Sequence, residues 1–146
     1  MSDYRECFIQ NLIADMKHDG DILVYNISFE RSRLNELITF FPKYRTELQF
    51  IIDRMRYLMI TFKERWYYTP KMKGSYSIKN VLPALVPSLC YDHLEINNGS
   101  LASSKFASIH NIKNNKELIE TRNHLLKYCR QDTLAIVMIL DVLRSV

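Results

Sequence analysis

Apolar residues recur at helical spacing over most of the chain and predict several amphipathic helices. A first helix is expected from Tyr4 to Met16, and a second from Ser28 to the residue before Pro42, which breaks the pattern. The stretch from Tyr44 to Ile52 repeats the same spacing. The longest helix is expected from Glu117 to Leu143, where no Gly or Pro intervenes. Its apolar face is predicted to comprise Leu118, Leu125, Cys129, Thr133, Ile136, Leu140 and Leu143.

A short apolar run at Ile22–Tyr25 predicts a buried strand, because it is β-prone, too brief for a helix, and bounded by Gly20 and Asn26. The segment Asp53–Ile60 fits either a strand or a helix, and periodicity does not decide between them. The chain is therefore expected to contain many helices and few strands. The fold class that follows is an α-rich α/β fold.

Aromatic and basic residues alternate between Phe62 and Lys79 around Pro70 and Gly74, which predicts a loop. After it, Ser77 is placed to cap a short helix that ends by Pro87. A turn at Asn97-Asn98-Gly99 precedes another helix, from about Ser100 to Ile109, and a polar loop from His110 to Lys116 leads to the long helix.

Composition narrows the class of protein without naming a function. A chain of 146 residues, 47% of them hydrophobic, is expected to form one domain over 1–146. The formal net charge of +4 permits a nucleic-acid partner but equally suits any protein kept away from zero charge. Three cysteines without a Cys-x-x-Cys pattern favour reduced thiols and a cytoplasmic location. The longest apolar run, Leu134–Leu140, is too short to span a membrane, so no membrane partner is expected.

Two segments carry carboxylates in positions suited to metal-dependent phosphodiester hydrolysis. Tyr128 and Asp132 are four residues apart on the long helix and share one face, and Glu30 follows the predicted strand. Hard divalent ions such as Mg²⁺ or Mn²⁺ prefer carboxylate oxygens, and a pair of them can activate water and neutralise the transition state. A phenol beside such a carboxylate can orient the attacking water.

Each of these signals also has an ordinary structural explanation. Tyr-x-x-x-Asp arises by chance in roughly a third of chains this long, so alone it decides nothing. Glu30 at a helix start is more often a partner of the helix dipole than a metal ligand. The aromatic and basic loop would stack on and pin a single nucleic-acid strand, or it simply covers the core while Lys and Arg reach outward. The four histidines show no ligand spacing.

The order of these features resembles the tyrosine-type branch of the DEDD superfamily of 3'-5' exonucleases, which have a ribonuclease H-like fold. The segments Leu23–Leu34, Met72–Pro83 and Leu126–Ala135 resemble a bacterial subfamily of it, and the resemblance extends over nearly all of the chain. It implies metal-dependent 3'-5' exonucleolytic hydrolysis of nucleic acid, with Mg²⁺ or Mn²⁺ as cofactor and a single-stranded nucleic acid as partner.

By this resemblance, Glu30 takes the second acidic position, usually Asp, and Tyr128 and Asp132 take the positions of the third motif. Glu30 and Asp132 are then the expected metal ligands, with Tyr128 as a further catalytic residue. The expected substrate-binding residues are Asn26, Phe29, Tyr76 and Lys79.

The chain departs from the family pattern at its front, because no Asp-x-Glu follows a strand before residue 26. The first motif of these enzymes lies on a three-stranded meander that has no counterpart here. We therefore expect an incomplete ribonuclease H-like domain, the C-terminal portion of an exonuclease-like domain, with little or no activity alone. The strand at Ile22–Tyr25 would lose a neighbour and expose an edge.

The competing hypothesis is a non-catalytic interaction or oligomerisation module that keeps the fold. Such a module would use the exposed strand edge, for instance to form a homodimer, or the aromatic and basic loop. Whether Glu30, Tyr128 and Asp132 share one cleft distinguishes the two hypotheses.

Overall fold

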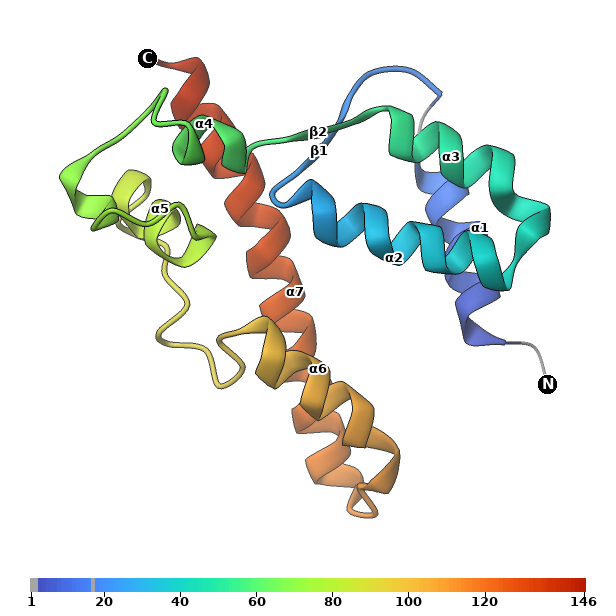
Figure 1. Ribbon diagram of the computed structural model, residues 1–146. Helices are drawn as coiled ribbons and strands as arrows, with labels where there is room; N and C mark the ends of the chain where they lie inside the picture. The colour runs from blue at the N-terminus through green and yellow to red at the C-terminus, as the bar shows by residue number, and fades with distance from the viewer. Residues whose placement is uncertain (1–2, 17) are drawn as a thin grey trace. The chain divides into compact units, whose positions relative to one another are not determined.

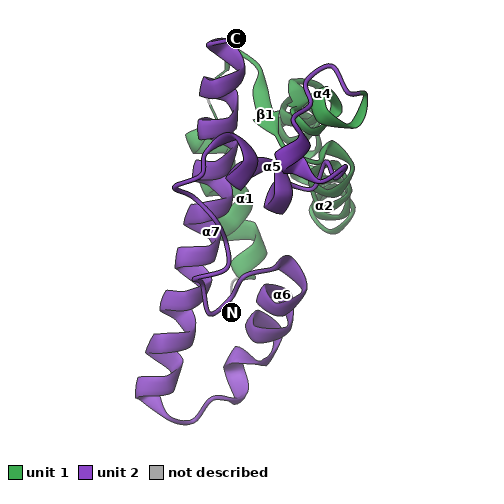
Figure 2. Ribbon diagram, turned by 90° about the vertical axis from the view of Figure 1, so that its left-hand side faces the viewer, with its two compact units in different colours: residues 1–64 green, residues 65–146 purple. Residues whose placement is uncertain are grey.

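The computed structural model describes residues 3–16 and 18–146, which form a helix-rich fold with one small sheet (Figure 1). The chain divides into two compact units, Met1–Glu64 and Arg65–Val146 (Figure 2). The predicted α-rich α/β class is confirmed at this level. The ribonuclease H-like topology and the single domain over 1–146 stay predictions.

The first unit contains the three helices expected before residue 64. Its first helix, α1 (Tyr4–Asp15), is capped by Asp3, whose side chain accepts a hydrogen bond of 2.9 Å from the backbone N–H of Arg5. The unit continues with β1 (Ile22–Val24), α2 (Ile27–Phe40), the 3₁₀ helix η1 (Pro42–Tyr44), α3 (Arg45–Asp53), β2 (Met55–Tyr57) and α4 (Met59–Lys63). The predicted strand and the three predicted helices are confirmed with small shifts of their ends.

The two strands pair in parallel, with Ile22 opposite Met55 and Val24 opposite Tyr57. Parallel strands need a long crossover connection, which α2, η1 and α3 provide. The segment that periodicity left open thus forms both kinds of structure, first β2 and then α4. The N–H of Ile22 donates to the carbonyl of Arg54 at 2.9 Å, and the N–H of Leu58 donates to the carbonyl of Val24 at 2.9 Å.

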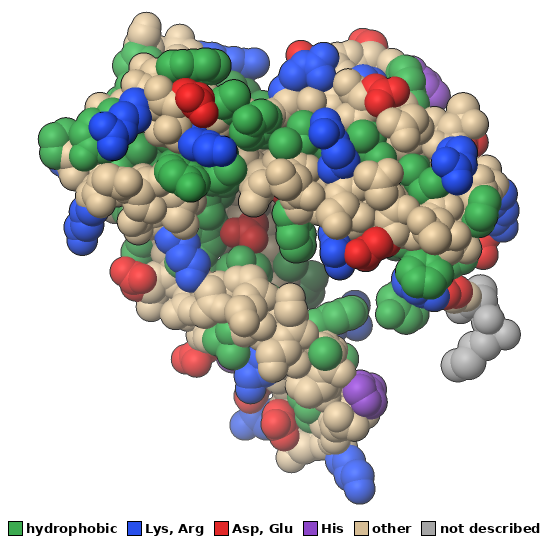
Figure 3. All heavy atoms as spheres, in the orientation of Figure 1, with side chains coloured by type: hydrophobic (Ala, Val, Ile, Leu, Met, Phe, Trp, Pro, Cys, Tyr) green, Lys and Arg blue, Asp and Glu red, His purple; other side chains and the backbone are tan. Residues whose placement is uncertain are grey.

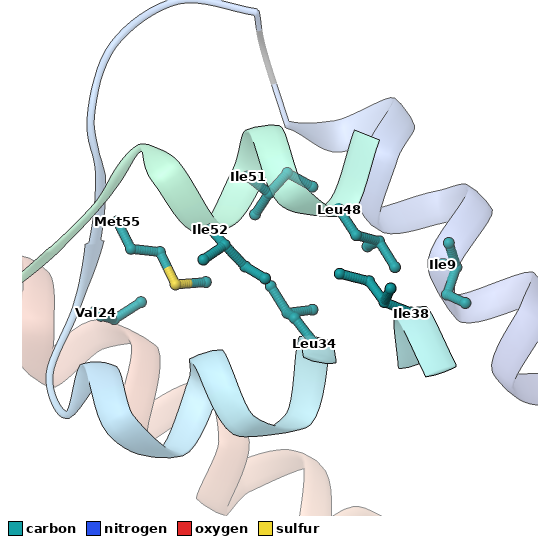
Figure 4. Packing of buried hydrophobic residues seen from close by; sticks show 8 residues of the cluster. All are labelled: Ile9, Val24, Leu34, Ile38, Leu48, Ile51, Ile52 and Met55. Carbon is teal, nitrogen blue, oxygen red and sulfur yellow. The ribbon is translucent and has the colours of Figure 1, made fainter. Parts of the chain in front are cut away.

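The core of the first unit lies where α1, α2, α3 and the sheet meet (Figure 4). Ile9 and Leu48 are fully enclosed there, and Leu34 and Ile38 project from α2 at the four-residue spacing of one helix face. The cluster comprises Ile9, Val24, Leu34, Ile38, Leu48, Ile51, Ile52 and Met55. The apolar residues that recur at helical spacing in the sequence are therefore the ones that form this core.

The second unit is built around one long helix, α7 (Asn115–Arg144), against which α5 and α6 pack (Figure 1). Its elements are the 3₁₀ helix η2 (Pro70–Met72), α5 (Ile78–Leu85), α6 (Gly99–Ser108), the 3₁₀ helix η3 (Ile109–Asn111) and α7. Asn98 caps α6 by accepting from the N–H of Leu101, and Asn114 caps α7 by accepting from the N–H groups of Lys116 and Glu117. These helices were predicted, with slightly different ends.

The buried face of α7 differs from the predicted one. Gln131, Ala135 and Ile139 form the buried stripe, whereas Cys129 and Thr133 of the predicted face are exposed. The reason is Gln131, a polar residue whose Nε2 donates to the carbonyl of Cys90 at 3.3 Å. A hydrophobic pattern assigns such a residue to the surface, but a hydrogen bond permits its burial.

The aromatic and basic segment is irregular, as expected, between the end of α4 and η2 and again before α5. Met72 is 1% exposed and anchors the segment, and Lys73 and Gly74 follow it with φ of 53° and 73°. Ser77 occupies the N-cap position of α5, but its side chain makes no capping hydrogen bond, so that part of the prediction is wrong. Within the described residues, every helix is too short or too polar to cross a bilayer.

Candidate functional site

Asp132 and Tyr128 lie on the same flank of α7, beside the buried stripe of that helix. Both side chains are half-buried, because their positions adjoin Gln131, which turns inward. The predicted neighbourhood of the phenol and the carboxylate is therefore present. This flank of α7 is turned toward the interior of the second unit, because the adjacent stripe of Gln131, Ala135 and Ile139 is buried.

A third residue, Tyr91, completes this group. Its side chain is 3% exposed, and its hydroxyl donates a hydrogen bond of 2.7 Å to Oδ1 of Asp132. The rings of Tyr91 and Tyr128 are tilted by 53°, with centroids 6.2 Å apart. We call Tyr91, Tyr128 and Asp132 the tyrosine–aspartate cluster.

The segment between α5 and α6 is held to α7 at two successive residues. The carbonyl of Cys90 accepts from Gln131, and the hydroxyl of Tyr91 donates to Asp132. The buried residue Ile96 anchors the same segment further along. Asp132 therefore has a structural role whatever its chemistry, since it orders an irregular segment that has few backbone hydrogen bonds of its own.

Burial and the neighbouring Asp132 carboxylate raise the pKa of Tyr128 well above its usual range. Although Cys129 as a whole residue is exposed, partial burial of its thiol and the same carboxylate raise the pKa of that thiol. Tyr128 consequently stays protonated at neutral pH. It can hold a water molecule by hydrogen bonding, but it is a poor proton acceptor, and Cys129 is a poor nucleophile.

The predicted residues of the second motif lie in the first unit. Asn26 is exposed at the N-cap position of α2, where its carbonyl accepts from the N–H of Phe29 at 3.0 Å. Phe29 is 63% exposed, and the guanidinium of Arg33 lies 5.8 Å from its ring centroid. Glu30 is half-buried in the first turn of α2. Asn26, Phe29 and Glu30 thus share one helix start, in a unit different from that of Asp132.

The two remaining predicted substrate residues belong to the second unit. Tyr76 is 45% exposed just before α5, and Lys79 is exposed in the first turn of that helix. Lys79 lines a pocket of about 440 Å³ together with Lys71 and Lys73. The placement of Tyr76 and Lys79 at an accessible surface is compatible with the predicted contact with a strand of nucleic acid.

The donor set for a metal ion is incomplete. Over residues 3–16 and 18–146, no group of three or more His, Cys, Asp or Glu side chains is arranged to hold one. In the tyrosine–aspartate cluster, Asp132 is the single carboxylate, and one of its oxygens already accepts from Tyr91. The cluster does not by itself fit a two-metal site, which needs several carboxylates around both ions.

Sequence reasoning missed Tyr91. It stands in an irregular segment with no periodicity, so the pattern of neighbouring residues gives no sign that it is buried. One general rule applies to Tyr91 once its burial is known: a buried tyrosine hydroxyl usually has a hydrogen-bond partner. That rule names no partner, and only the folded chain brings Tyr91 to Asp132.

Comparison with known proteins finds a family model and relatives that are themselves described as uncharacterized. Residues 1–77 match the family model described as "Domain of unknown function (DUF2779)". The chain is 32% identical over 112 residues to the uncharacterized protein UU173 of Ureaplasma parvum serovar 3, an alignment that covers 64% of this chain and 16% of that protein. It is 27% identical over 151 aligned positions to the uncharacterized protein MG366 of Mycoplasma genitalium, which covers 95% of this chain and 22% of that protein.

The matched part of the chain therefore spans 16% and 22% of the lengths of these two relatives. No solved structure matches it. The family match includes Asn26, Phe29, Glu30 and Tyr76, whereas Asp132 lies in the part that is aligned with the Mycoplasma protein.

Proposed function

We propose that this chain, which belongs to the DUF2779 family, supplies part of the catalytic site of a metal-dependent 3'-5' exonuclease-like domain that hydrolyses nucleic-acid phosphodiesters. The observation that carries the proposal is the tyrosine–aspartate cluster. Asp132 is fixed by the buried Tyr91, and Tyr128 stands beside it with a hydroxyl that remains protonated. A fixed carboxylate next to a neutral phenol suits a metal ligand with a water-orienting neighbour.

In this proposal Asp132 and Glu30 are metal ligands, and Tyr128 holds a water molecule near the scissile phosphate. The metal, Mg²⁺ or Mn²⁺, would supply charge neutralisation and an activated water. Tyr91 is a positioning residue, because its hydrogen bond fixes the orientation of the Asp132 carboxylate. Asn26 and Phe29 would contact substrate at the start of α2.

The proposed site requires carboxylates beyond those two, since a two-metal site needs more ligands. They would come from residues outside these 146, and the greater length of the two relatives is compatible with that. The chain alone is then expected to bind metal weakly and to cleave nucleic acid slowly or not at all. A cytoplasmic location and a single-stranded substrate belong to the same proposal.

The test is whether Mn²⁺ binds at each predicted ligand. Mn²⁺ broadens the NMR signals of nearby amides, so we expect broadening at residues 26–31 and at 128–133. Asp132→Asn should abolish the broadening at residues 128–133, because it removes the predicted ligand there. Broadening at neither segment, or broadening at 128–133 that persists in Asp132→Asn, would refute the predicted ligands.

A nuclease assay tests the activity itself. The chain with Mg²⁺ or Mn²⁺ is expected to leave single-stranded DNA and RNA almost intact. Asp132→Asn is the matched variant, since its amide oxygen can still accept from Tyr91 while the negative charge is lost. Robust cleavage that depends on Asp132 would show that the site is complete, and would overturn the expected inactivity of the chain alone.

A second candidate function is the non-catalytic module, and the sheet favours it. Ile22 and Val24 direct their backbone groups toward β2, so the N–H and carbonyl of Leu23 face the opposite edge of a two-stranded sheet. A homodimer formed through that edge would protect the Leu23 amide from hydrogen exchange as protein concentration rises. Monomeric behaviour with unchanged exchange at Leu23 over the accessible concentrations would reject this candidate.

A further inference from the structure

Three lysines converge on one pocket in the second unit. Lys71 belongs to η2, Lys73 follows it, and Lys79 lies in the first turn of α5. The pocket measures about 440 Å³, within the size range of clefts that hold small ligands. It is lined by Lys71, Lys73, Lys79, Asn80, Pro83, Ala84 and Asp92.

The backbone fixes this convergence. Met72 is 1% exposed and holds η2 against the core, so its neighbours Lys71 and Lys73 remain at the surface on either side of it. Lys73 and Gly74 both adopt left-handed conformations, and this sharp turn brings the chain back toward α5. Lys79 then stands on the exposed side of α5, while Val81 and Leu82 are fully buried.

The pocket is positive. It gathers three ammonium groups against one carboxylate, that of Asp92. Within residues 3–16 and 18–146, none of these three lysines forms a salt bridge. Their charges are therefore available to a ligand, and Figure 3 shows Lys and Arg side chains at the surface around η2 and α5.

The start of α5 adds a fixed partial charge of the same sign. Ser77 makes no side-chain capping bond, so the first N–H groups of the helix are not satisfied by that side chain. The positive end of the helix dipole thus lies in the same turn as Lys79. Oxyanions are the ligands that such a combination of ammonium groups and helix N–H groups binds.

Exposed aromatic rings border the lysines along the chain. Tyr68 and Tyr76 are 51% and 45% exposed, and Trp66 is 71% exposed. Unpaired bases stack on such rings, whereas the bases of a duplex are already stacked on one another. An oxyanion pocket with neighbouring stacking surfaces suits a single strand better than a duplex or a free ion.

We propose that Lys71, Lys73 and Lys79 form a phosphate-binding site that holds the backbone of a single-stranded nucleic acid. This inference rests on the proposed function for the class of its ligand. The site itself needs neither a metal ion nor Asp132. Lys71 and Lys73 thereby join Lys79 in binding, and Asn80 is placed to donate to the same phosphate groups.

The test is the salt dependence of binding to a fluorescently labelled oligonucleotide of about 12 nucleotides, measured by anisotropy in EDTA. Each lysine–phosphate contact on a single strand contributes about 0.7 to the slope of log K against log salt. Replacing all three lysines by Gln should therefore lower the magnitude of the slope by about 2, and each single replacement by about 0.7. Circular dichroism of the triple variant should match that of the wild type, because the three side chains are exposed.

A matched control keeps the total charge change the same. Lys105, Lys113 and Lys116 are also exposed lysines of the second unit, and their replacement by Gln should leave the slope unchanged. An equal loss in this control would show that only overall charge matters and would overturn the site. An unchanged slope in the Lys71, Lys73 and Lys79 variant would do the same.

Two further binding experiments identify the class of ligand. A duplex of the same sequence should bind more weakly than the single strand, and equal binding would overturn the assignment to single strands. Inorganic phosphate should compete only at high concentration; shifts of the three lysine amides by phosphate without any oligonucleotide binding would mean that the site takes a free anion instead.

The two proposals can fail separately. If the lysine-dependent slope is present while Mn²⁺ broadens neither predicted ligand segment, the phosphate site stands without the exonuclease. If the slope is absent while Mn²⁺ binds at the predicted ligands, the exonuclease proposal stands and the lysine site is rejected.

Discussion

The hydrogen bond between Tyr91 and Asp132 allows a structural role to be separated from a catalytic one. Tyr91→Phe removes the hydroxyl from a side chain that is 3% exposed and leaves the ring in place. A hydrogen bond to a charged group contributes about 1.5 to 3 kcal/mol. Because Asp132 is half-buried and can recover water, we expect the lower end, a loss of about 1.5 kcal/mol.

Asp132→Asn is the complementary change. The amide oxygen of Asn still accepts a hydrogen bond from Tyr91, so a bond to a charged group is replaced by a neutral one. Only the difference between the two is lost, and the loss of stability should be smaller, about 0.5 to 1 kcal/mol. Metal binding, in contrast, should disappear in this variant. Tyr68→Phe serves as the control, because Tyr68 is 51% exposed and its change should stay within about 0.5 kcal/mol.

Urea denaturation followed by circular dichroism measures these differences. With a slope near 2 kcal/mol/M, a loss of about 1.5 kcal/mol lowers the midpoint by about 0.75 M. Hydrogen exchange of residues 87–97 should accelerate about tenfold in Tyr91→Phe, since the bond holds that segment to α7. Equal stability of Tyr91→Phe and Tyr68→Phe, with unchanged exchange, would refute the structural role of the bond.

Two further predictions concern the first unit and the turn before α5. Hydrogen bonding by Lys43 and then by Tyr44 lowers the pKa of Glu6, so its stabilising effect is present above the unfolded pKa and is lost as pH falls through the lower folded pKa. The difference in Tm between wild type and Glu6→Gln should therefore begin to shrink as pH falls past the unfolded pKa of about 4.3, and it should vanish only below the folded pKa. Gly74 has φ of 73°, so Gly74→Ala should cost about 1 kcal/mol in urea denaturation. Gly99→Ala should be neutral, since a Cβ there would lie 3.6 Å from the Tyr128 hydroxyl, and equal losses at the two glycines would contradict this reasoning.

The helices of the chain could be predicted because their determinants are local. The apolar spacing of α1, α2 and α3, the Asn98 cap and the absence of Gly or Pro in α7 are all visible in the sequence. The strand β2 could not be predicted, because its partner β1 lies far away in the sequence and a three-residue strand has no period of its own. Pairing between distant segments is a property of the packed unit.

The candidate site was predictable only in part, for a similar reason. Tyr128 and Asp132 share a helix face by their spacing alone, so the sequence places them together. Tyr91 reaches Asp132 through an irregular segment, and Gln131 is buried through a hydrogen bond to the backbone. Three lysines from η2, the following turn and α5 converge for the same reason, since the burial of Met72 fixes the turn between them.

The parallel pairing of β1 with β2 has a consequence for the order of folding. Only three residues pair on each strand, and the connection between them contains α2, η1 and α3. Closing so long a loop costs entropy before these few hydrogen bonds can form, so we expect α2 and α3 to pack first through Leu34, Ile38 and Leu48. The sheet then forms late, and substitutions in it should mainly accelerate unfolding, whereas substitutions at the contact of the two helices should slow folding.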